Sequence, residues 1–304
     1  MEELLHQGIR QNSAKPTWLK IEQTKNQDWN LLHGELKKRG LHTVCEEARC
    51  PNIKECWSAR TATIMILGDV CTRGCRFCHV KTGNPQGLVE LREIKNSSEL
   101  VGLMSLRYVV ITSVDRDDLE DHGAQHFANV INRIHADHPE VHVEALVPDF
   151  GAVEWRMDIL ASSQPYVVAQ NMETVKRLTY PVRDVRASYE KTLRCLEYYK
   201  SKHNLRTKSS LMVGLGETLE ELQETMRDLR SVGTDIITFG QYLQPTAKHL
   251  PVVRYYTPEE FRLLKKLAYE VGFSFVASGP LVRSSYKASD YLEYVEKKQD
   301  VQSH

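Results

Sequence analysis

The sequence predicts an α/β protein whose parallel sheet is curled into a partial (β/α)6 TIM-like barrel, with an extension at each end. From residue 61 onward, six strand-like apolar segments alternate with amphipathic, helix-like segments, the order that produces a parallel sheet covered by helices. The 304 residues, 41% of them hydrophobic, are enough to bury one large core. Such barrels carry their active sites at the carboxyl ends of the strands.

The chain is expected to divide into an N-terminal extension of residues 1–60, a barrel of residues 61–280 and a C-terminal tail of residues 281–304. In the extension, a helix-like stretch from Trp29 to Arg39 ends at Gly40. Strands are expected where apolar and β-branched residues concentrate, at 61–67, 107–112, 141–147, 165–170, 207–213 and 235–242. Helices are expected near 120–136, 152–162, 187–202, 217–232 and 258–271.

Three cysteines follow the first expected strand in the run Cys-Thr-Arg-Gly-Cys-Arg-Phe-Cys, as Cys71, Cys75 and Cys78. Thiols that leave one strand end can share one metal site. An ordinary structural zinc or ferredoxin-type site is fully ligated by protein, whereas a four-iron cluster on three thiolates leaves one iron open to a small molecule. The alternative is a structural zinc site that His79 completes, although zinc motifs usually pair two close ligands with a distant second pair.

This octet resembles the signature of the radical S-adenosylmethionine (SAM) enzymes, in which an aromatic residue precedes the last cysteine, as Phe77 does here. The resemblance implies that the amino and carboxylate groups of SAM bind the open iron. It also implies a partial barrel of the radical SAM type.

A second cysteine triad, Cys45, Cys50 and Cys56, lies in the extension. Its spacing does not place the thiols on one helix face, and Pro51 interrupts any helix, so a loop folded around a metal fits better. A strand over 61–67 would hold the two triads roughly 20 Å apart, at about 3.3 Å per residue, which favours two separate sites. The alternative role for the second triad is a zinc or redox-inert cluster that fixes the extension to the barrel.

Composition excludes several classes of protein. Forty basic residues balance forty acidic ones, so no overall field attracts nucleic acid or an anionic membrane. No apolar run reaches the roughly 18 residues of a membrane span, and the first residues lack the features of a signal or transit peptide, so a cytoplasmic location is expected. Clustered cysteines fit metal binding in a reducing compartment, and Cys195 is expected in the core.

Polar residues and glycines follow the other expected strands and are candidates by position. Ser113 and Asp115 follow the second strand, and Asn171 and Glu173 follow the fourth. Serine and aspartate are also common helix caps, which is the alternative for the first pair. Near the C-terminus, residues 278–288 are expected to form a loop, whose alternative role is simply to close the barrel mouth. This loop contains Arg-Ser-Ser-Tyr, residues 283–286.

Over residues 15–288 the chain resembles the lipoyl synthase family. The resemblance is carried by both triads and by the runs at 41–48, 50–52, 55–57, 65–68, 111–119, 212–217, 240–243 and 283–286. The chain departs from the family's usual pattern at three places. The family usually has Asn-His-Asn in the run where this chain has Gln170. It usually has Arg-Pro-Gly where this chain has Asp184 in the run, and Asp-Gly-Gly where this chain has His122.

The resemblance implies a radical SAM sulfurtransferase that inserts sulfur at C6 and C8 of a protein-bound octanoyl group, whose unactivated C–H bonds require a cofactor. It implies SAM and two 4Fe-4S clusters. The first cluster is held by the Cys71 triad, and the second, the sulfur donor, by the Cys45 triad and by Ser285, with Ser284 as the alternative ligand. The expected SAM contacts are Phe77, Ser113, Asp115, Asn171, Glu173 and Arg183.

The same resemblance implies protein partners. These are octanoylated lipoyl-carrier domains, namely the E2 subunits of 2-oxoacid dehydrogenases and the glycine cleavage H protein, an electron donor such as ferredoxin or flavodoxin, and a protein that repairs the spent cluster. Two other function classes stay open. One is a different radical SAM enzyme with an accessory cluster, such as a methylthiotransferase or a biotin-synthase-like enzyme, and the other is a non-enzymatic zinc or iron–sulfur module.

Overall fold

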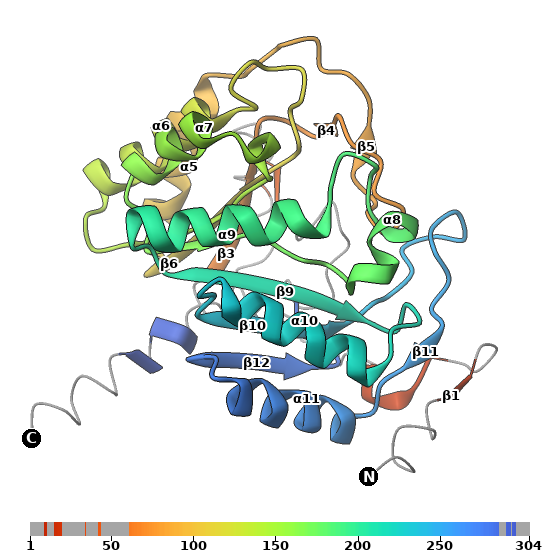
Figure 1. Cartoon of the computed structure of the whole chain (residues 1–304). Coiled ribbons are helices and arrows are strands. Elements are labelled where there is room, and N and C mark those ends of the chain that lie inside the picture. Colours follow the sequence, from red (N-terminus) through yellow and green to blue (C-terminus); the bar gives the residue numbers. More distant parts are fainter. Residues whose placement is uncertain are drawn as a thin grey trace, which may run out of the picture.

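The computed structural model describes residues 9–10, 15–19, 34, 42–43, 61–285, 290–292 and 294–295. Its main sheet contains seven parallel strands in the order β12-β10-β9-β8-β7-β6-β3 (Figure 1). An eighth strand, β2 (His42–Thr43), pairs antiparallel with the outer edge of β3. The parallel strands are β3 (Thr61–Ile66), β6 (Tyr108–Ser113), β7 (His142–Leu146), β8 (Val167–Ala169), β9 (Thr207–Val213), β10 (Ile236–Gln241) and β12 (Phe275–Gly279).

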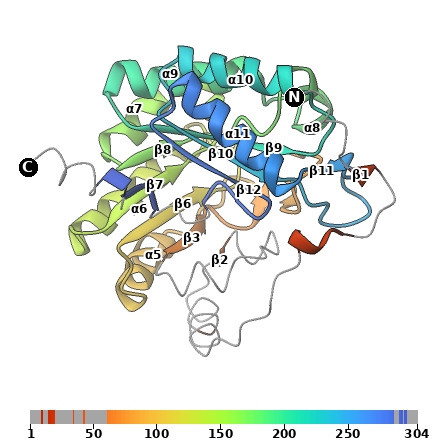
Figure 2. The same ribbon diagram turned by 90° about the horizontal axis from the view of Figure 1, so that it is seen from below.

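Helices cover the outer side of the curled sheet (Figures 1 and 2). They are α5 (Arg92–Leu103), α6 (Ala124–Asp137), α7 (Glu154–Ser162), α9 (Tyr189–His203), α10 (Leu219–Ser231) and α11 (Pro258–Val271). The connections contain β4 (Val70–Cys71), β5 (Lys81–Thr82), η2 (Phe150–Ala152), η3 (Lys176–Leu178), α8 (Thr179–Val182) and β11 (Arg254–Tyr255). Within the described residues, no helix has both the length and the apolar character that a bilayer span requires.

Strand β6 shows how the sheet buries both of its faces. Val109 and Ile111 belong to the large core between the sheet and the first helices, and the alternating Tyr108 and Val110 face the other side. There they pack against Leu292 of the tail. Strands that are buried on both faces are nearly continuous apolar runs, so this segment is recognisable in the sequence.

Helices α10 and α11 begin at sites that the sequence specifies. Thr218 and Thr257 each accept a hydrogen bond from the backbone amide three residues later, and the glutamate at that position bonds back to the threonine amide. This reciprocal capping satisfies amides that the first helical turn leaves unpaired. Both helices therefore start directly after the strand-end loops that surround the barrel mouth.

The predicted α/β parallel sheet is confirmed, with seven parallel strands rather than six. The additional strand, β12, lies parallel to β10, from Phe275 opposite Ile236 to Gly279 opposite Gly240. The prediction of a loop from residue 278 is therefore wrong for Ser278 and Gly279. The strand is short and ends in small residues, which are weak strand signals, and pairing with β10 overrides that local preference.

Helix α5 is the other element that the sequence did not predict. Its middle contains Ser97 and Ser98, which are fully buried although their hydroxyls are not apolar. Serine is a modest helix former and interrupts the apolar stripe that identifies a helix in a sequence. The buried glutamate Glu93 in its first turn accepts hydrogen bonds from the amides of Leu67 (2.8 Å) and Gly68 (3.1 Å), so this helix fixes the end of β3.

Both ends of the chain are attached to the barrel. Residues Ile9–Arg10 form β1, which pairs antiparallel with β11, and the Trp18 indole nitrogen donates to the carbonyl of Tyr256 at 3.2 Å. In the tail, Tyr291 packs against Val167 and Ile236, which begin strands β8 and β10. These residues of the tail therefore cover the amino-terminal end of the sheet, opposite the expected active site. The domain boundaries stay a prediction.

Candidate active site

Two adjoining cavities lie at the carboxyl ends of the parallel strands. The first, of about 250 Å³, is lined by the loop of Cys71, Cys75 and Cys78 and by residues at the ends of β6, β7 and β8. The second, of about 390 Å³, is lined by residues at the ends of β9 and β10 and by residues 282–285. The residues that line both cavities are Phe77, Cys78, Val80, Asn171, Glu173 and Ser284.

The three thiols of the first cavity are in surroundings that oppose thiolate formation. Burial, with a smaller contribution from the Asp115 carboxylate, raises the pKa of Cys71 to about 12. Burial also raises the pKa of Cys75 to about 12 and that of Cys78 above its usual range. Three buried thiols grouped in this way need a positively charged metal to become thiolates, as metal–sulfur ligation requires.

The three thiols line a cavity with room for a multi-atom cluster. Among the described residues, no group of three or more His, Cys, Asp and Glu side chains surrounds a point where one ion would be held. The ring of His79, which was the alternative zinc ligand, packs against the ring of His249 with their centroids 5.3 Å apart. The three thiols instead line a cavity that is much larger than one ion.

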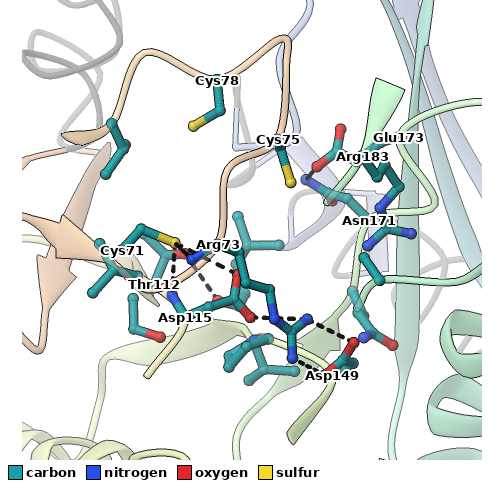
Figure 3. A pocket seen from close by; sticks show the side chains of 18 of the residues that line it. Cys71, Arg73, Cys75, Cys78, Thr112, Asp115, Asp149, Asn171, Glu173 and Arg183 are labelled. Carbon is teal, nitrogen blue, oxygen red and sulfur yellow. Dashed lines mark hydrogen bonds and ion pairs between the residues drawn. The ribbon is translucent and has the colours of Figure 1, made fainter. Parts of the chain in front are cut away.

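Arg73, inside the cysteine loop, anchors that loop to the ends of two strands. Its guanidinium contacts both oxygens of Asp149 at 2.8 Å and donates to Asp117 at 2.7 to 3.2 Å. Asp115 lies 3.2 Å from the same guanidinium, and Figure 3 shows Arg73, Asp115 and Asp149 below Cys75 and Cys78. Arg73 and Asp149 are almost fully buried, so the charges are screened little by water.

The aspartates around Arg73 differ in pKa. Burial raises the pKa of Asp115 to about 6, although Arg73 opposes that rise. Burial acts in the same direction on Asp117, but hydrogen bonds from Arg73 and Thr72 lower its pKa to about 2. The sequence analysis did not identify Arg73 or Asp149. An arginine between two cluster cysteines, together with acids after two successive strands, would have been the available signal.

The residues predicted to contact SAM all line the first cavity: Phe77, Ser113, Asp115, Asn171, Glu173 and Arg183. Ser113 Oγ, Asn171 Oδ1 and Arg183 Nε are buried and have no hydrogen-bond partner among the described residues. Buried polar atoms are rarely left unpaired. These acceptors and donors fit a polar ligand with amino, carboxylate and hydroxyl groups, as SAM has, and the individual contacts stay predictions.

Glu173 and Asn171 form the wall between the two cavities. Asn171 Nδ2 donates to Glu173 Oε1 at 3.0 Å, and Glu173 has a left-handed backbone conformation with φ of 68°. Such a conformation is costly for a residue other than glycine. Burial raises the pKa of Glu173, partly offset by the nearby Arg183. The strained backbone therefore places a carboxyl group at the junction of both cavities.

The tail crosses strand β10 at a glycine. A Cβ atom at Gly240 would lie 2.0 Å from the carbonyl oxygen of Val282, so only glycine allows this approach. Arg283 Nη1 then donates to the carbonyls of Gln241 (3.2 Å) and Val282 (2.8 Å). As a result Ser284 lines both cavities, and Ser285 lines the second.

The second triad, Cys45, Cys50 and Cys56, lies outside the described residues. The strands that flank it in the sequence are described. Thr43 of β2 lies opposite Ile64 of β3, and the chain re-enters the described structure at Thr61. The triad segment is therefore bracketed by two strands at the β3 edge of the barrel.

Comparison with known proteins shows the family. Residues 65–229 match the model of the Radical SAM superfamily. A relative named lipoyl synthase from Francisella tularensis subsp. novicida is 55% identical over 275 residues, which cover 90% of this chain and 84% of that protein. The chain belongs to the lipoyl synthase family. The lipoyl synthase of Deinococcus radiodurans is 53% identical over 279 residues, which cover 91% of this chain and 84% of that protein.

Solved structures agree on the fold. Streptococcus suis SuiB bound to precursor peptide SuiA superposes with a TM-score of 0.57 at 12% identity, over 88% of this chain and 57% of SuiB. Methylornithine synthase superposes with a TM-score of 0.51 at 12% identity, over 82% of this chain and 81% of that chain. The chain thus spans only part of SuiB but most of methylornithine synthase.

Membership of the lipoyl synthase family makes this chain a sulfur-inserting radical SAM enzyme. SAM and one 4Fe-4S cluster are the cofactors that the superfamily domain implies, and the thiols and unpaired polar atoms of the first cavity fit them. The alternatives of a methylthiotransferase, a biotin-synthase-like enzyme and a non-enzymatic module find no support in these matches.

Two of the three departures from the usual lipoyl synthase pattern lie on the network that holds the cysteine loop. Asp184 Oδ2 accepts from the amide of Gly74 at 2.8 Å, and His122 Nδ1 lies 3.7 Å from Asp117 Oδ1. His122 has a positive φ of 53°, which explains why glycine is usual at that position. The third departure, Gln170, lines the first cavity.

Proposed function

We propose that this chain inserts two sulfur atoms, at C6 and C8 of a protein-bound octanoyl group, and that a second 4Fe-4S cluster is the sulfur donor. The observation that carries the proposal is the adjoining pair of cavities. One holds the cysteine triad that the superfamily match covers, and the other holds Ser284 and Ser285. Because the cavities adjoin, a substrate carbon in the first cavity would lie close to a sulfur donor in the second.

The residues of the first cavity would hold the first cluster and SAM. Cys71, Cys75 and Cys78 supply three thiolates, and Ser113, Asn171 and Arg183 supply the unpaired polar atoms. When bound, cluster and SAM together supply a 5′-deoxyadenosyl radical, which removes hydrogen from unactivated carbon. The protein's own contribution is to orient the ligand and to exclude water from the cavity.

The second cluster would be held by Cys45, Cys50, Cys56 and Ser285. The second cavity also contains the apolar side chains Leu211, Met212, Tyr242 and Leu243, a suitable environment for an alkyl chain. A serine oxygen is a poorer match to iron than a thiolate, so the iron at Ser285 would be the easiest to release. A cluster that gives up its sulfide needs an iron that is held this weakly.

The proposed partners follow from this chemistry. The substrate carrier would be an octanoylated lipoyl domain or the glycine cleavage H protein, in the cytoplasm. Ferredoxin or flavodoxin would supply electrons, and another protein would rebuild the spent cluster.

A single-turnover assay tests the proposal. Wild-type protein, incubated anaerobically with SAM, a reductant and an octanoylated lipoyl-domain peptide, is expected to give the dithiolated peptide by mass spectrometry. Cys50→Ala is expected to lose only the sulfur donor, so 5′-deoxyadenosine should still form while sulfur-containing product is absent. Sulfur insertion by Cys50→Ala at the wild-type level would contradict a donor cluster on this triad.

The tail serine gives a second, finer prediction. Ser285→Cys is expected to retain the second cluster but to slow sulfur transfer about tenfold, because thiolate holds that iron more firmly. Ser285→Ala is expected to lower the iron content. The readouts are iron content and the rate of product formation in one turnover.

Ser284 provides the matched control, because it is the adjacent residue and has the same side chain. If Ser285 is the ligand, Ser284→Cys should leave both iron content and transfer rate close to the wild-type values. If the effects appear at Ser284 instead, that residue is the ligand. Normal transfer in the cysteine variants at both positions would reduce the tail to a lid over the barrel.

A further inference from the structure

Residues 184–186, which follow helix α8, contact the first cluster's cysteine loop at three points. The backbone amide of Asp184 donates to Cys75 Sγ at 3.3 Å, and its Oδ2 accepts from the amide of Gly74 at 2.8 Å. Arg186 Nη2 donates to the carbonyl of Thr72 at 2.6 Å. The loop is thus held from a segment more than 100 residues away in the sequence.

The amide of Asp184 is held in a fixed direction by a local turn. The backbone carbonyl of Asp184 accepts a hydrogen bond from the amide of Ala187 at 2.9 Å. The side-chain Oδ1 of Asp184 accepts a hydrogen bond from the amide of Arg186 at 3.0 Å. An aspartate at the first position of such a turn commonly bonds to the backbone two residues later. Arg183, just before it, has extended dihedrals (φ −97°, ψ 167°), which direct the next amide toward the cysteine.

The carboxylate of Asp184 is charged and paired. Arg186 Nε donates to Oδ1 at 2.8 Å, and these hydrogen bonds hold the pKa of Asp184 well below its usual range. The guanidinium therefore offsets the negative charge that the carboxylate brings near the cysteines. The amide of Asp184 donates to Cys75 Sγ, so the positive end of its dipole points at the sulfur, in addition to the field of the nearby Arg183 guanidinium.

We propose that Asp184 is a positioning residue that sets the reduction potential of the cluster on Cys71, Cys75 and Cys78, through its amide. Reduction adds negative charge to an iron–sulfur cluster, and hydrogen bonds to the cysteine sulfurs stabilise that charge. Cys71 Sγ accepts comparable hydrogen bonds from the backbone amides of Arg73 and Asp115, each with an N–S distance of 3.4 Å. Proline at position 184 would remove the amide hydrogen that faces Cys75, because proline has no N–H.

The test compares Asp184→Pro with Asp184→Ala, both in a Cys50→Ala background so that one cluster contributes to the signal. Both variants lose the carboxylate, but only proline loses the amide hydrogen. The measurement is a redox titration followed by electron paramagnetic resonance. At a given applied potential, the ratio of reduced to oxidised cluster is expected to be tenfold lower in Asp184→Pro than in Asp184→Ala. For a one-electron couple that is a negative shift of 59 mV.

Equal potentials in the two variants, with equal iron content, would overturn the proposal and leave Asp184 as a turn residue only. A more positive potential in the proline variant would overturn it as well. Iron content separates both outcomes from a simple failure to assemble the cluster. The proposal concerns the cluster that superfamily membership implies, so it does not depend on the sulfur donor.

If Asp184→Pro assembles no cluster, a labelling experiment tests the amide directly. Asp184→Ala and the unsubstituted parent are prepared with ¹⁵N-alanine, and the reduced cluster is examined by pulsed electron paramagnetic resonance. Only the variant has an alanine amide donating to Cys75, so a ¹⁵N coupling is expected in the variant in addition to any from Ala187, which lines the cavity in both proteins. Identical spectra in the two proteins would overturn the proposal.

Discussion

Replacement of Cys71, Cys75 or Cys78 with alanine is expected to reduce SAM cleavage to the background level. All three thiols line the same cavity and are the proposed iron ligands, and no further cysteine among the described residues lines that cavity. The loop itself is held by Arg73 and Asp184 rather than by the thiols, so the fold should survive. The measurement is 5′-deoxyadenosine formed under anaerobic reducing conditions, with iron content on the same sample.

Iron content makes this prediction specific. Two four-iron clusters give about eight irons per chain, and loss of the first should leave about four. Cys195→Ala is the matched control, because Cys195 is a buried cysteine whose thiol donates to the carbonyl of Asp149 at 3.4 Å, away from the three ligands. Full 5′-deoxyadenosine production by any of the three triad variants would refute the cluster assignment.

Arg73→Met is expected to destabilise the apo-protein by about 3–5 kcal/mol and to prevent stable binding of the first cluster. The substitution leaves the carboxylates of Asp115, Asp117 and Asp149 grouped without their shared cation, and an uncompensated buried charge costs about that much. Arg73→Lys should be intermediate, since an ammonium cannot bond two carboxylates with the planar fork of arginine. Urea unfolding and iron content are the measurements.

An exposed arginine provides the comparison. Arg177 lies 2.6 Å from Glu221, and 55% of its side chain is exposed, so Arg177→Met should cost no more than about 1 kcal/mol. If Arg73→Met were no more harmful than Arg177→Met, the buried network would not anchor the loop. A stable Arg73→Met protein with a full first cluster would lead to the same conclusion.

The barrel could be predicted from the sequence because strands such as β6 are buried on both faces and are therefore continuous apolar runs. The three cysteines could be predicted because their spacing is itself the signal. Arg73 was not predicted, because its position between two cysteines becomes a signal only when it is considered together with the acids that follow two strands. Helix α5 and strand β12 contain buried or terminal small residues, and their stability comes from packing rather than from local preference.

The same distinction applies within the site. Gly240 contributes no functional group, and its role becomes visible only through the 2.0 Å that would separate an added Cβ from the Val282 carbonyl. In the sequence Asp184 is notable only as a departure from the usual family pattern, and only the fold brings its amide to Cys75. For Ser285 the sequence motif predicted a ligand in residues 283–286, and the structure shows that Ser285 lines the second cavity, while its role as a ligand stays a prediction.

The pairing of β1 with β11 has a consequence for synthesis of the chain on the ribosome. Arg10 pairs with Arg254, about 240 residues later, and Trp18 bonds to Tyr256. At roughly 5–20 residues per second, the partners of this segment emerge about 12 to 48 s after the segment itself. During that interval Trp18 lacks the carbonyl of Tyr256 to which its indole donates in the finished structure. Arg10 and Trp18 are therefore synthesised early but can form these contacts only late.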